Sequence, residues 1–318
     1  MPQPTRSDVH VNAILTNVSV AYLQSESSFV ARQVFPMVPV EKQSDKYFIY
    51  TKNDWLRDEA QMRGDASPSA GSGYGLSTAT YSCNVFAMHK DVGHQVRANA
   101  DSPINMDRDA TRFVTHRLLV RMEIQWVSDY FTTSVWDTDV VGGTDFTVWS
   151  NYSASNPIND VETGKESILG VTGQMPNTLV IGYQVFRQLK HHPDVIDRIK
   201  YTSSNNVTAD LLAALFEVDR VLVCQAIKAT NNEGETAAYS FTHGKHALLC
   251  YVAPNPGLLT PSAGYTFSWS GVSGMGSEIA VSSFYIDELR ADRIEAEMAW
   301  DNKVVGSDCG YFFSGAVA

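Results

Sequence analysis

KYFIYTK (Lys46 to Lys52) and STATYSCNV (Ser77 to Val85) lie in the most informative part of the sequence, which runs from Lys46 to Trp136. The first run is dense in aromatic and β-branched residues, and the second alternates polar with apolar residues. Both patterns are typical of β-strands. We expect the two runs to pair as an antiparallel arm. Because a two-stranded ribbon is only marginally stable in water, this arm needs a surface to lie on.

The connection between the two runs is too long for an ordinary hairpin turn. It extends from Asn53 to Leu76 and ends in the Gly/Ser-rich run SPSAGSGYG. A structureless loop of that length is unusual inside a compact domain unless it is functional or becomes ordered against a partner. A solvated charge run is the default interpretation of its arginines, but the neighbouring Trp55 favours an interface. We therefore predict that Trp55, Arg57 and Arg63 make contacts between subunits.

One very long amphipathic helix follows. Asp101-Ser102-Pro103 is a helix start signal, and Asp107 and Asp109 place negative charge in the early turns. Apolar residues recur at three- and four-residue steps: Met106, Ala110, Phe113, Val120, Ile124, Val127 and Phe131, with Leu119, Met122, Trp126 and Tyr130 widening the stripe. A helix over about 104–136 would reach about 45 Å. That length predicts a spine on which other elements are laid.

The composition describes a chain that hides much of its surface. The 318 residues carry 24 basic and 35 acidic side chains, a net charge of −11, which argues against tight binding to a nucleic-acid backbone. Only 19% of the residues are charged and 11% are aromatic, which fits extensive contacts between copies. The four cysteines are widely spaced, which indicates a reducing compartment and neither a zinc site nor a redox motif. No signal peptide or membrane span is evident, so we expect a soluble, cytoplasmic product.

The remaining chain divides into a strap, a small α/β region and a strand-rich tail. Pro36 and Pro39 favour an extended strap over regular helix near the N-terminus. Buried-strand runs and helical spacings alternate from Pro176 onward. We expect irregular structure or a short strand over 137–157, helices over 158–170 and 209–215, and strands over 178–182, 220–226 and 246–252. The tail then alternates strictly through Ile294, Ala296, Met298 and Trp300, turns at Asp301-Asn302 and closes with Gly310 to Phe313.

The sequence offers little that resembles catalytic chemistry. His191-His192-Pro193-Asp194 is the one cluster of this kind, and a hydrolase using His191, His192 and Asp194 is the hypothesis it supports. A metal site would need further ligands from elsewhere, because adjacent helical residues point about 100° apart. A polar helix end before Pro193 is the favoured interpretation. There is no Gly-x-Ser-x-Gly elbow and no phosphate loop, so we predict no enzyme, no cofactor and no metal.

The order of these elements resembles the major capsid proteins of tailed double-stranded DNA bacteriophages (Caudoviricetes), which share the Hong Kong 97-like fold. Short stretches along nearly the whole chain are also similar to sequences of this family. The similar stretches are FVARQVFP (Phe29 to Pro36), RANAD (Arg97 to Asp101), PNTLVIG (Pro176 to Gly182), LKHHPD (Leu189 to Asp194) and KVVG (Lys303 to Gly306).

The resemblance implies an α+β fold with five parts. They are an N-terminal arm over 1–45, an extended β-hairpin loop over 46–92, a peripheral domain over 93–175 that holds the spine helix, an α/β axial domain over 176–260, and a strand-rich return to the peripheral domain over 261–318. It further implies a structural protein that assembles as hexamers and pentamers into an icosahedral head around double-stranded DNA. The expected location is the virion, and the host cytoplasm during assembly.

The resemblance also sets expectations for partners. No long charged helical segment precedes residue 30, so a separate scaffolding protein is expected, together with a portal and possibly a decoration protein. Lys46 and Lys52 lie on the arm, but nothing singles out a crosslinking partner, and we predict no crosslink. An encapsulin-like compartment shell, which has the same build and encloses cargo enzymes, is the alternative of the same class.

Overall fold

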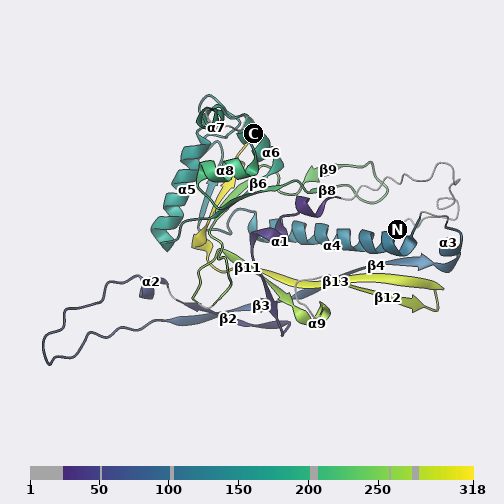
Figure 1. Ribbon diagram of the computed structural model, residues 1–318, viewed down its shortest axis with the longest axis horizontal. Helices are drawn as coiled ribbons and strands as arrows, with labels where there is room; N and C mark the ends of the chain where they lie inside the picture. Colours follow the sequence, from purple (N-terminus) through teal and green to yellow (C-terminus); the bar gives the residue numbers. More distant parts are fainter. Residues whose placement is uncertain (1–23, 51, 101–103, 201–206, 258, 274–278) are drawn as a thin grey trace.

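The computed structural model describes residues 24–50, 52–100, 104–200, 207–257, 259–273 and 279–318. Two packed halves and a long projecting arm make up the described chain (Figure 1). Its helices are α1 (Ala31–Val34), α2 (Lys52–Trp55), α3 (His94–Ala98), α4 (Met106–Tyr130), α5 (Pro157–Thr172), α6 (Tyr183–His191), α7 (Pro193–Ile199), α8 (Ala209–Phe216) and α9 (Ser270–Ser273). Its strands are β1 (Met37–Val40), β2 (Ser44–Tyr50), β3 (Leu76–Ser82), β4 (Asn84–Gly93), β5 (Thr138–Val141), β6 (Thr178–Gly182), β7 (Arg220–Cys224), β8 (Ile227–Ala229), β9 (Tyr239–Phe241), β10 (Ala247–Cys250), β11 (Gly264–Trp269), β12 (Ala280–Ile286), β13 (Ala291–Val304) and β14 (Gly310–Ser314).

The first half, called the sheet half here, is a twisted β-sheet with α4 on one face. Its strands follow the order β1-β11-β13-β12, with β4 pairing alongside β13. Alternate residues of β13 from Ile294 to Trp300 are buried in the clusters that contain the apolar face of α4. The predicted period-two strand is therefore confirmed, because only an extended chain places every second residue on one face.

The predicted turn at Asp301-Asn302 is wrong. β13 continues through both residues to Val304, and it pairs with β11 up to Gly264. Each polar side chain has a partner there: Asp301 accepts from the backbone N–H of Ser82 at 2.7 Å, and Asn302 donates to Asp129 at 2.8 Å. Asp and Asn favour turns through bonds to their own backbone, whereas here their side chains bond to β3 and α4.

The long helix is present but shorter than predicted. It covers 25 residues, Met106–Tyr130, and Asn105 caps it by accepting the N–H of Arg108 at 3.0 Å. The predicted start signal at 101–103 lies outside the described residues. The helix ends at Tyr130 rather than near 136, because the indole N–H of Trp136 bonds the Tyr130 carbonyl at 2.7 Å and the chain turns through a left-handed Ser134. Its length is about 37 Å.

The buried face of α4 also differs from the predicted stripe. Phe113 is 39% exposed, whereas Val114 and Leu118, which the prediction omitted, are buried. The buried set is Ala110, Val114, Leu118, Leu119, Met122, Glu123, Trp126 and Tyr130. This face is wide because β4 and β13 cover one side of the helix and the N-terminal segment covers the other. The buried carboxylate of Glu123 lies in the middle of it.

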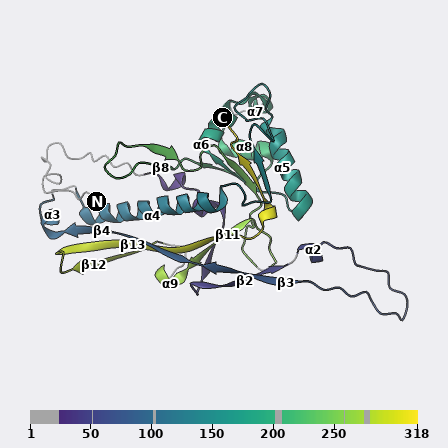
Figure 2. The same cartoon turned by 180° about the vertical axis from the view of Figure 1, so that it is seen from behind.

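The second half, called the α/β half here, is a five-stranded sheet in the order β5-β14-β10-β6-β7. Ala247 and Leu249 of β10 face the cluster formed by α5 to α8, while Leu248 and Cys250 face a core shared with α4. The strands predicted at 178–182, 220–226 and 246–252 are present, as are the helices predicted at 158–170 and 209–215. Sheet and helices lie beside the end of α4 (Figure 2).

The N-terminal segment crosses from one half to the other. The predicted extended strap is partly correct: α1 forms one helical turn before Pro36, and β1 then runs parallel to β11 with Met37 opposite Thr266. Phe35 packs on Trp126 and Tyr130, with ring centroids 5.9 and 4.6 Å away. One hydrophobic core therefore extends from the sheet half into the α/β half.

The arm consists of β2 and β3 with the loop between them. The two strands pair antiparallel from Ser44 opposite Ser82 to Tyr50 opposite Leu76, which confirms the predicted ladder. The second predicted run is broken at Cys83, which is fully buried and donates its backbone N–H to Gln43 at 2.8 Å. Beyond it β4 pairs with β13 instead.

No helix in the described ranges is long and apolar enough to cross a membrane.

Candidate assembly surfaces

The root of the arm is anchored on the face of the sheet opposite α4. Tyr81 stacks on Phe267 with ring centroids 4.7 Å apart, and Tyr47 lies 5.4 Å from the same ring. Burial of Cys83 beside them raises its thiol pKa to about 11, so the thiol is neutral and acts as a small apolar group. Lys52 forms an ion pair with Asp308 where the arm leaves the body.

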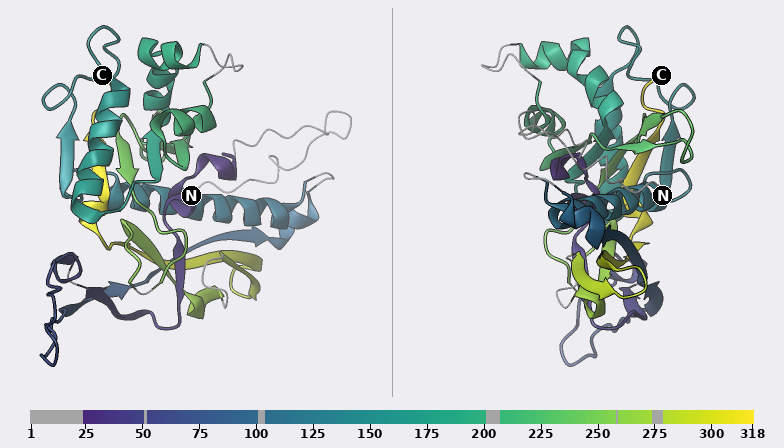
Figure 3. Two further views of the ribbon diagram at one scale, coloured as in Figure 1. Left: turned by 60° about the vertical axis from the view of Figure 1, so that its left-hand side comes forward. Right: turned by 90° about the vertical axis from the view of Figure 1, so that its right-hand side faces the viewer.

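Beyond this root the arm keeps large apolar side chains exposed within the described part of the chain. Phe48 is 56% exposed and Leu76 is 51% exposed, although both belong to paired strands. The loop projects beyond both halves, whereas the base of the ribbon lies against the sheet half (Figure 3). A two-stranded ribbon is marginal in water, and its exposed apolar side chains mark a candidate contact surface.

The loop carries a small aromatic cluster. The ring of Trp55 lies 6.2 Å from that of Tyr50 and 5.6 Å from that of Tyr74. Trp55 nevertheless stays 54% exposed and Tyr74 64% exposed. Asp54 accepts the backbone N–H of Gly75 at 2.7 Å and so ties the two ends of the loop together. The cluster orders the loop without burying it.

The predicted contact residues all lie on this loop. Arg57 lies 3.7 Å from both Asp54 and Glu59, and Arg63 donates from Nε to the carbonyl of Ser67 at 2.6 Å. Both arginines therefore also have partners inside the loop. Two further apolar residues of the arm are exposed: Phe48 on β2, and Met62 on the loop, which is fully exposed.

A second exposed apolar surface lies on β12. This edge strand has no charged residue, and Val281, Phe284 and Tyr285 are each 46% exposed. The following turn adds Leu289, which is 56% exposed. Proteins usually protect such an edge with charges or a cover, since it otherwise pairs with other chains. The strand is a second candidate for contact between copies.

The cluster His191-His192-Pro193-Asp194 has a structural role in the fold. His192 is fully buried and caps α7: its Nδ1 accepts the backbone N–H of Asp194 at 3.2 Å. Burial lowers the pKa of His192, so the ring is neutral and its proton lies on Nε2, which donates to Ser155 Oγ at 2.9 Å. The Ser155 hydroxyl in turn donates to the Asn151 carbonyl at 2.7 Å.

This arrangement has the residue types of a hydrolytic triad but the opposite proton placement. A catalytic histidine needs a free lone pair on the nitrogen that faces the serine, with the other nitrogen donating to the carboxylate. Here the nitrogen that faces Ser155 carries the proton. Ser155 is also buried. The geometry supports the helix-end interpretation over a hydrolase, with His191 exposed beside it.

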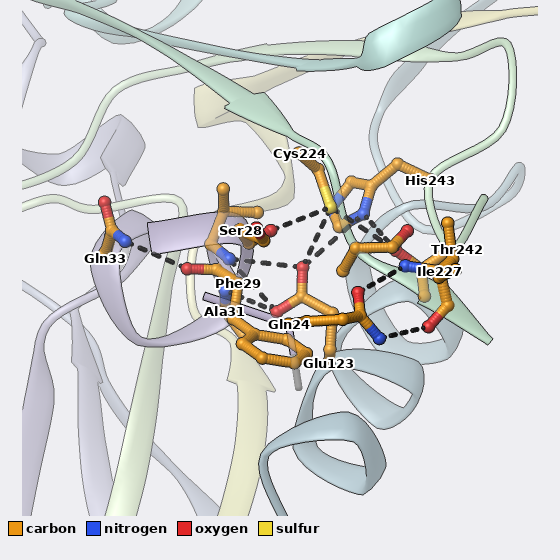
Figure 4. A network of polar contacts seen from close by, with 12 residues as sticks. Gln24, Ser28, Phe29, Ala31, Gln33, Glu123, Cys224, Ile227, Thr242 and His243 are labelled. Atoms are coloured by element: carbon orange, nitrogen blue, oxygen red, sulfur yellow. Dashed lines mark hydrogen bonds and ion pairs between the residues drawn. The ribbon is translucent and has the colours of Figure 1, made fainter. Parts of the chain in front are cut away.

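A buried polar cluster joins Glu123 of α4, Cys224 of β7 and His243 of the turn after β9 (Figure 4). Glu123 Oε1 lies 3.3 Å from Cys224 Sγ and 3.6 Å from His243 Nδ1. Burial raises the pKa of Glu123 and lowers that of His243 to about 3. These residue types are among those that bind transition metals, and no pattern in the sequence singled them out.

Comparison with known proteins gives a consistent result. No family model matches the sequence. The chain is 26% identical to the major capsid protein of Burkholderia phage BcepMu over 96% of both chains. A phage-related protein of Bordetella bronchiseptica RB50 is similar in structure, with a TM-score of 0.69, 24% identity, and coverage of 92% of this chain and 94% of that one.

More distant structures share the architecture. The capsid of cyanophage P-SCSP1u has a TM-score of 0.64 at 10% identity, covering 97% of this chain and 93% of that one. The SrpI encapsulin of Synechococcus elongatus PCC 7942 has a TM-score of 0.57 at 11% identity, covering 96% and 92%. The chain therefore has a mixed α+β fold similar to those of phage capsid proteins.

Proposed function

We propose that this chain is the major capsid protein of a tailed bacteriophage and assembles into the head that encloses double-stranded DNA. The observation that carries the proposal is the projecting arm, whose aromatic residues stay exposed within the chain. The full-length similarity to a phage major capsid protein supports the same conclusion. A subunit of this kind is completed by its neighbours.

The parts of the chain have corresponding roles in this proposal. Residues 1–45 form the N-terminal arm, 46–92 the extended loop, 93–175 and 261–318 the peripheral domain with α4 as its spine, and 176–260 the axial domain of a Hong Kong 97-like fold. The subunits form hexamers and pentamers that close into an icosahedral shell. Trp55, Arg57 and Arg63 contact the neighbouring copy.

The proposed partners follow from the same role. A separate scaffolding protein guides assembly in the host cytoplasm, a portal occupies one vertex, and a decoration protein is a further candidate partner. The net charge of −11 supports a wall that encloses DNA without binding it tightly. The affinity of isolated capsomers for duplex DNA at low salt tests this point, and tight binding would contradict it.

Electron microscopy of the expressed protein, alone and with a neighbouring scaffold candidate, tests the main proposal. Closed shells are expected under at least one of these conditions. Monomers under every condition would contradict the proposal.

The encapsulin-like compartment is a second candidate, because the SrpI encapsulin shares the fold. The two differ in their gene neighbours. Portal, terminase and tail genes are expected beside a phage capsid gene, whereas a cargo-enzyme gene beside this one would favour the compartment.

A further inference from the structure

Glu123 is a charged residue in a place where charge is costly. Its side chain is fully buried on the apolar face of α4, between Leu119 and Trp126. Burial of a carboxylate is unfavourable unless hydrogen bonds replace its water. Among the described residues, the ionisable group within ion-pair distance is the imidazole of His243, at 3.6 Å. The carboxylate therefore depends on hydrogen-bond donors that the fold brings to it.

Those donors come from the N-terminal segment, residues 24–35, which we call the strap. The backbone N–H of Ala31 donates to Oε2 at 2.9 Å, and that of Val30 reaches Oε2 at 3.1 Å and Oε1 at 3.2 Å. Both belong to the start of α1, where backbone N–H groups have no partner within the helix. The thiol of Cys224 adds a contact to Oε1 at 3.3 Å (Figure 4). One carboxylate thus bonds to the strap and to the α/β half at once.

The strap is also bonded directly to β7 and β8. Arg220 donates to the carbonyls of Gln33 and Val34 at 2.9 and 2.8 Å. Gln24 exchanges two hydrogen bonds of 2.8 Å with the backbone of Ile227. On the other side, Phe29 packs edge-on against His116 of α4 with centroids 5.8 Å apart. The strap therefore lies between the two halves and contacts both.

We propose that Glu123 is a positioning residue whose hydrogen bonds fix the place of the strap. The strap, held in this place, keeps α4 and the α/β half in one relative orientation. The carboxylate sits where α4, the strap and β7 meet. An apolar side chain would fill the same space but would leave the Val30 and Ala31 donors without an acceptor. The charge is retained for placement, since well-packed apolar residues usually stabilise a core at least as well.

A bound metal ion is the competing explanation for Glu123, Cys224 and His243. Two observations favour the proposal that Glu123 binds the strap and no metal. The carboxylate oxygens already accept three contacts from strap N–H groups. In addition, His243 Nε2 has no hydrogen-bond partner among the described residues, whereas a metal-bound histidine almost always donates its other ring N–H.

Hydrogen–deuterium exchange of the unassembled full chain tests the proposal without requiring a shell. In Glu123→Gln, peptides covering 28–35 should exchange on the order of ten- to a hundredfold faster, because a charge-assisted acceptor is lost. Asp129→Asn is the matched control: it removes a half-buried carboxylate of the same helix that bonds Gln125 and Asn302 instead, and strap exchange should keep its wild-type rate. Unchanged strap exchange in Glu123→Gln would overturn the proposal. Equal acceleration in α5 and β10 would overturn it too, since that indicates general unfolding.

Cys224→Ala provides a milder variant that keeps the carboxylate, with Cys250→Ala as its buried control. It should loosen the strap less than Glu123→Gln does, and Cys250→Ala should leave the strap unchanged. Metal analysis of the purified protein completes the test. One equivalent of zinc in the wild-type protein that is lost in both Glu123→Gln and Cys224→Ala would overturn the proposal in favour of a metal site. A metal-free wild-type protein whose strap is protected from exchange would support the proposal.

Discussion

The α/β half and the arm satisfy their apolar residues in opposite ways. Every residue of β6 and β10 is buried, between helices on one face and the shared core on the other. On the arm, Phe48, Trp55 and Leu76 are all more than half exposed. The chain therefore combines a core that buries its own apolar residues with an arm that leaves several of them exposed. Substitutions in the core should therefore lower stability, whereas substitutions on the arm should impair assembly.

A pair of leucines offers the largest contrast. Leu249→Ala in β10 should lower the free energy of unfolding by about 2–5 kcal/mol, because it removes a fully buried side chain and leaves a cavity. Leu76→Ala on the arm, 51% exposed, should change it by less than about 0.5 kcal/mol. Equilibrium urea unfolding measures both. An equal loss in the two variants would show that the arm is part of the core.

Acid should weaken the buried core through His243. Its pKa is about 3 in the folded chain, below the ordinary value of 6.5, so the unfolded chain binds the proton first. Its contribution to stability is therefore complete above pH 6.5 and is lost as the pH falls toward 3, by at most about 1.4 kcal/mol per pH unit. Glu123 acts in the opposite sense: its pKa is raised, so protonation favours the folded chain as the pH falls through that raised pKa.

Urea unfolding at pH 7 and pH 5 of wild type and His243→Asn isolates the histidine. The loss of stability between the two pH values should be smaller in the variant. An identical loss in both proteins would assign the acid sensitivity to other groups.

Trp55→Ala should have the smallest effect on folding and a clear effect on assembly. The free energy of unfolding should stay within about 0.5 kcal/mol of wild type, since the side chain is 54% exposed. The yield of closed particles, measured by light scattering and electron microscopy, should fall. Tyr239→Ala is the control, because it removes a 66% exposed aromatic residue from β9, away from the arm. Normal particle yield in Trp55→Ala would remove this residue from the predicted contact.

The elements that sequence predicted best are those whose pattern is enforced by one local partner. The alternation from Ile294 to Trp300 reports a strand with one face on α4, and the apolar run from Thr178 to Gly182 reports a strand covered on both faces. In both cases the apolar pattern of the strand matches its burial. The arm ladder was predicted from strand propensity instead, since most residues of β2 and β3 are exposed.

The errors lie where tertiary contacts override local signals. Cys83 ends β3 because the chain changes partner from β2 to β13, and nothing in the alternation announces that change. Asp301 and Asn302 were predicted as a turn, although Asp301 bonds to β3 and Asn302 bonds to α4. Glu123 was not predicted at all, because its burial depends on donors that the strap supplies. The predicted contacts of Trp55, Arg57 and Arg63 remain predictions.

Removal of the loop tests the central claim most directly. Deletion of residues 53–76 leaves Ile49 and Ser77 as a ladder pair, with three residues to close the hairpin. We expect a variant that unfolds in urea at the wild-type midpoint but forms no closed shell in electron micrographs, alone or with a scaffold candidate. Normal shells from this variant would contradict the claim that the subunit is completed through its arm.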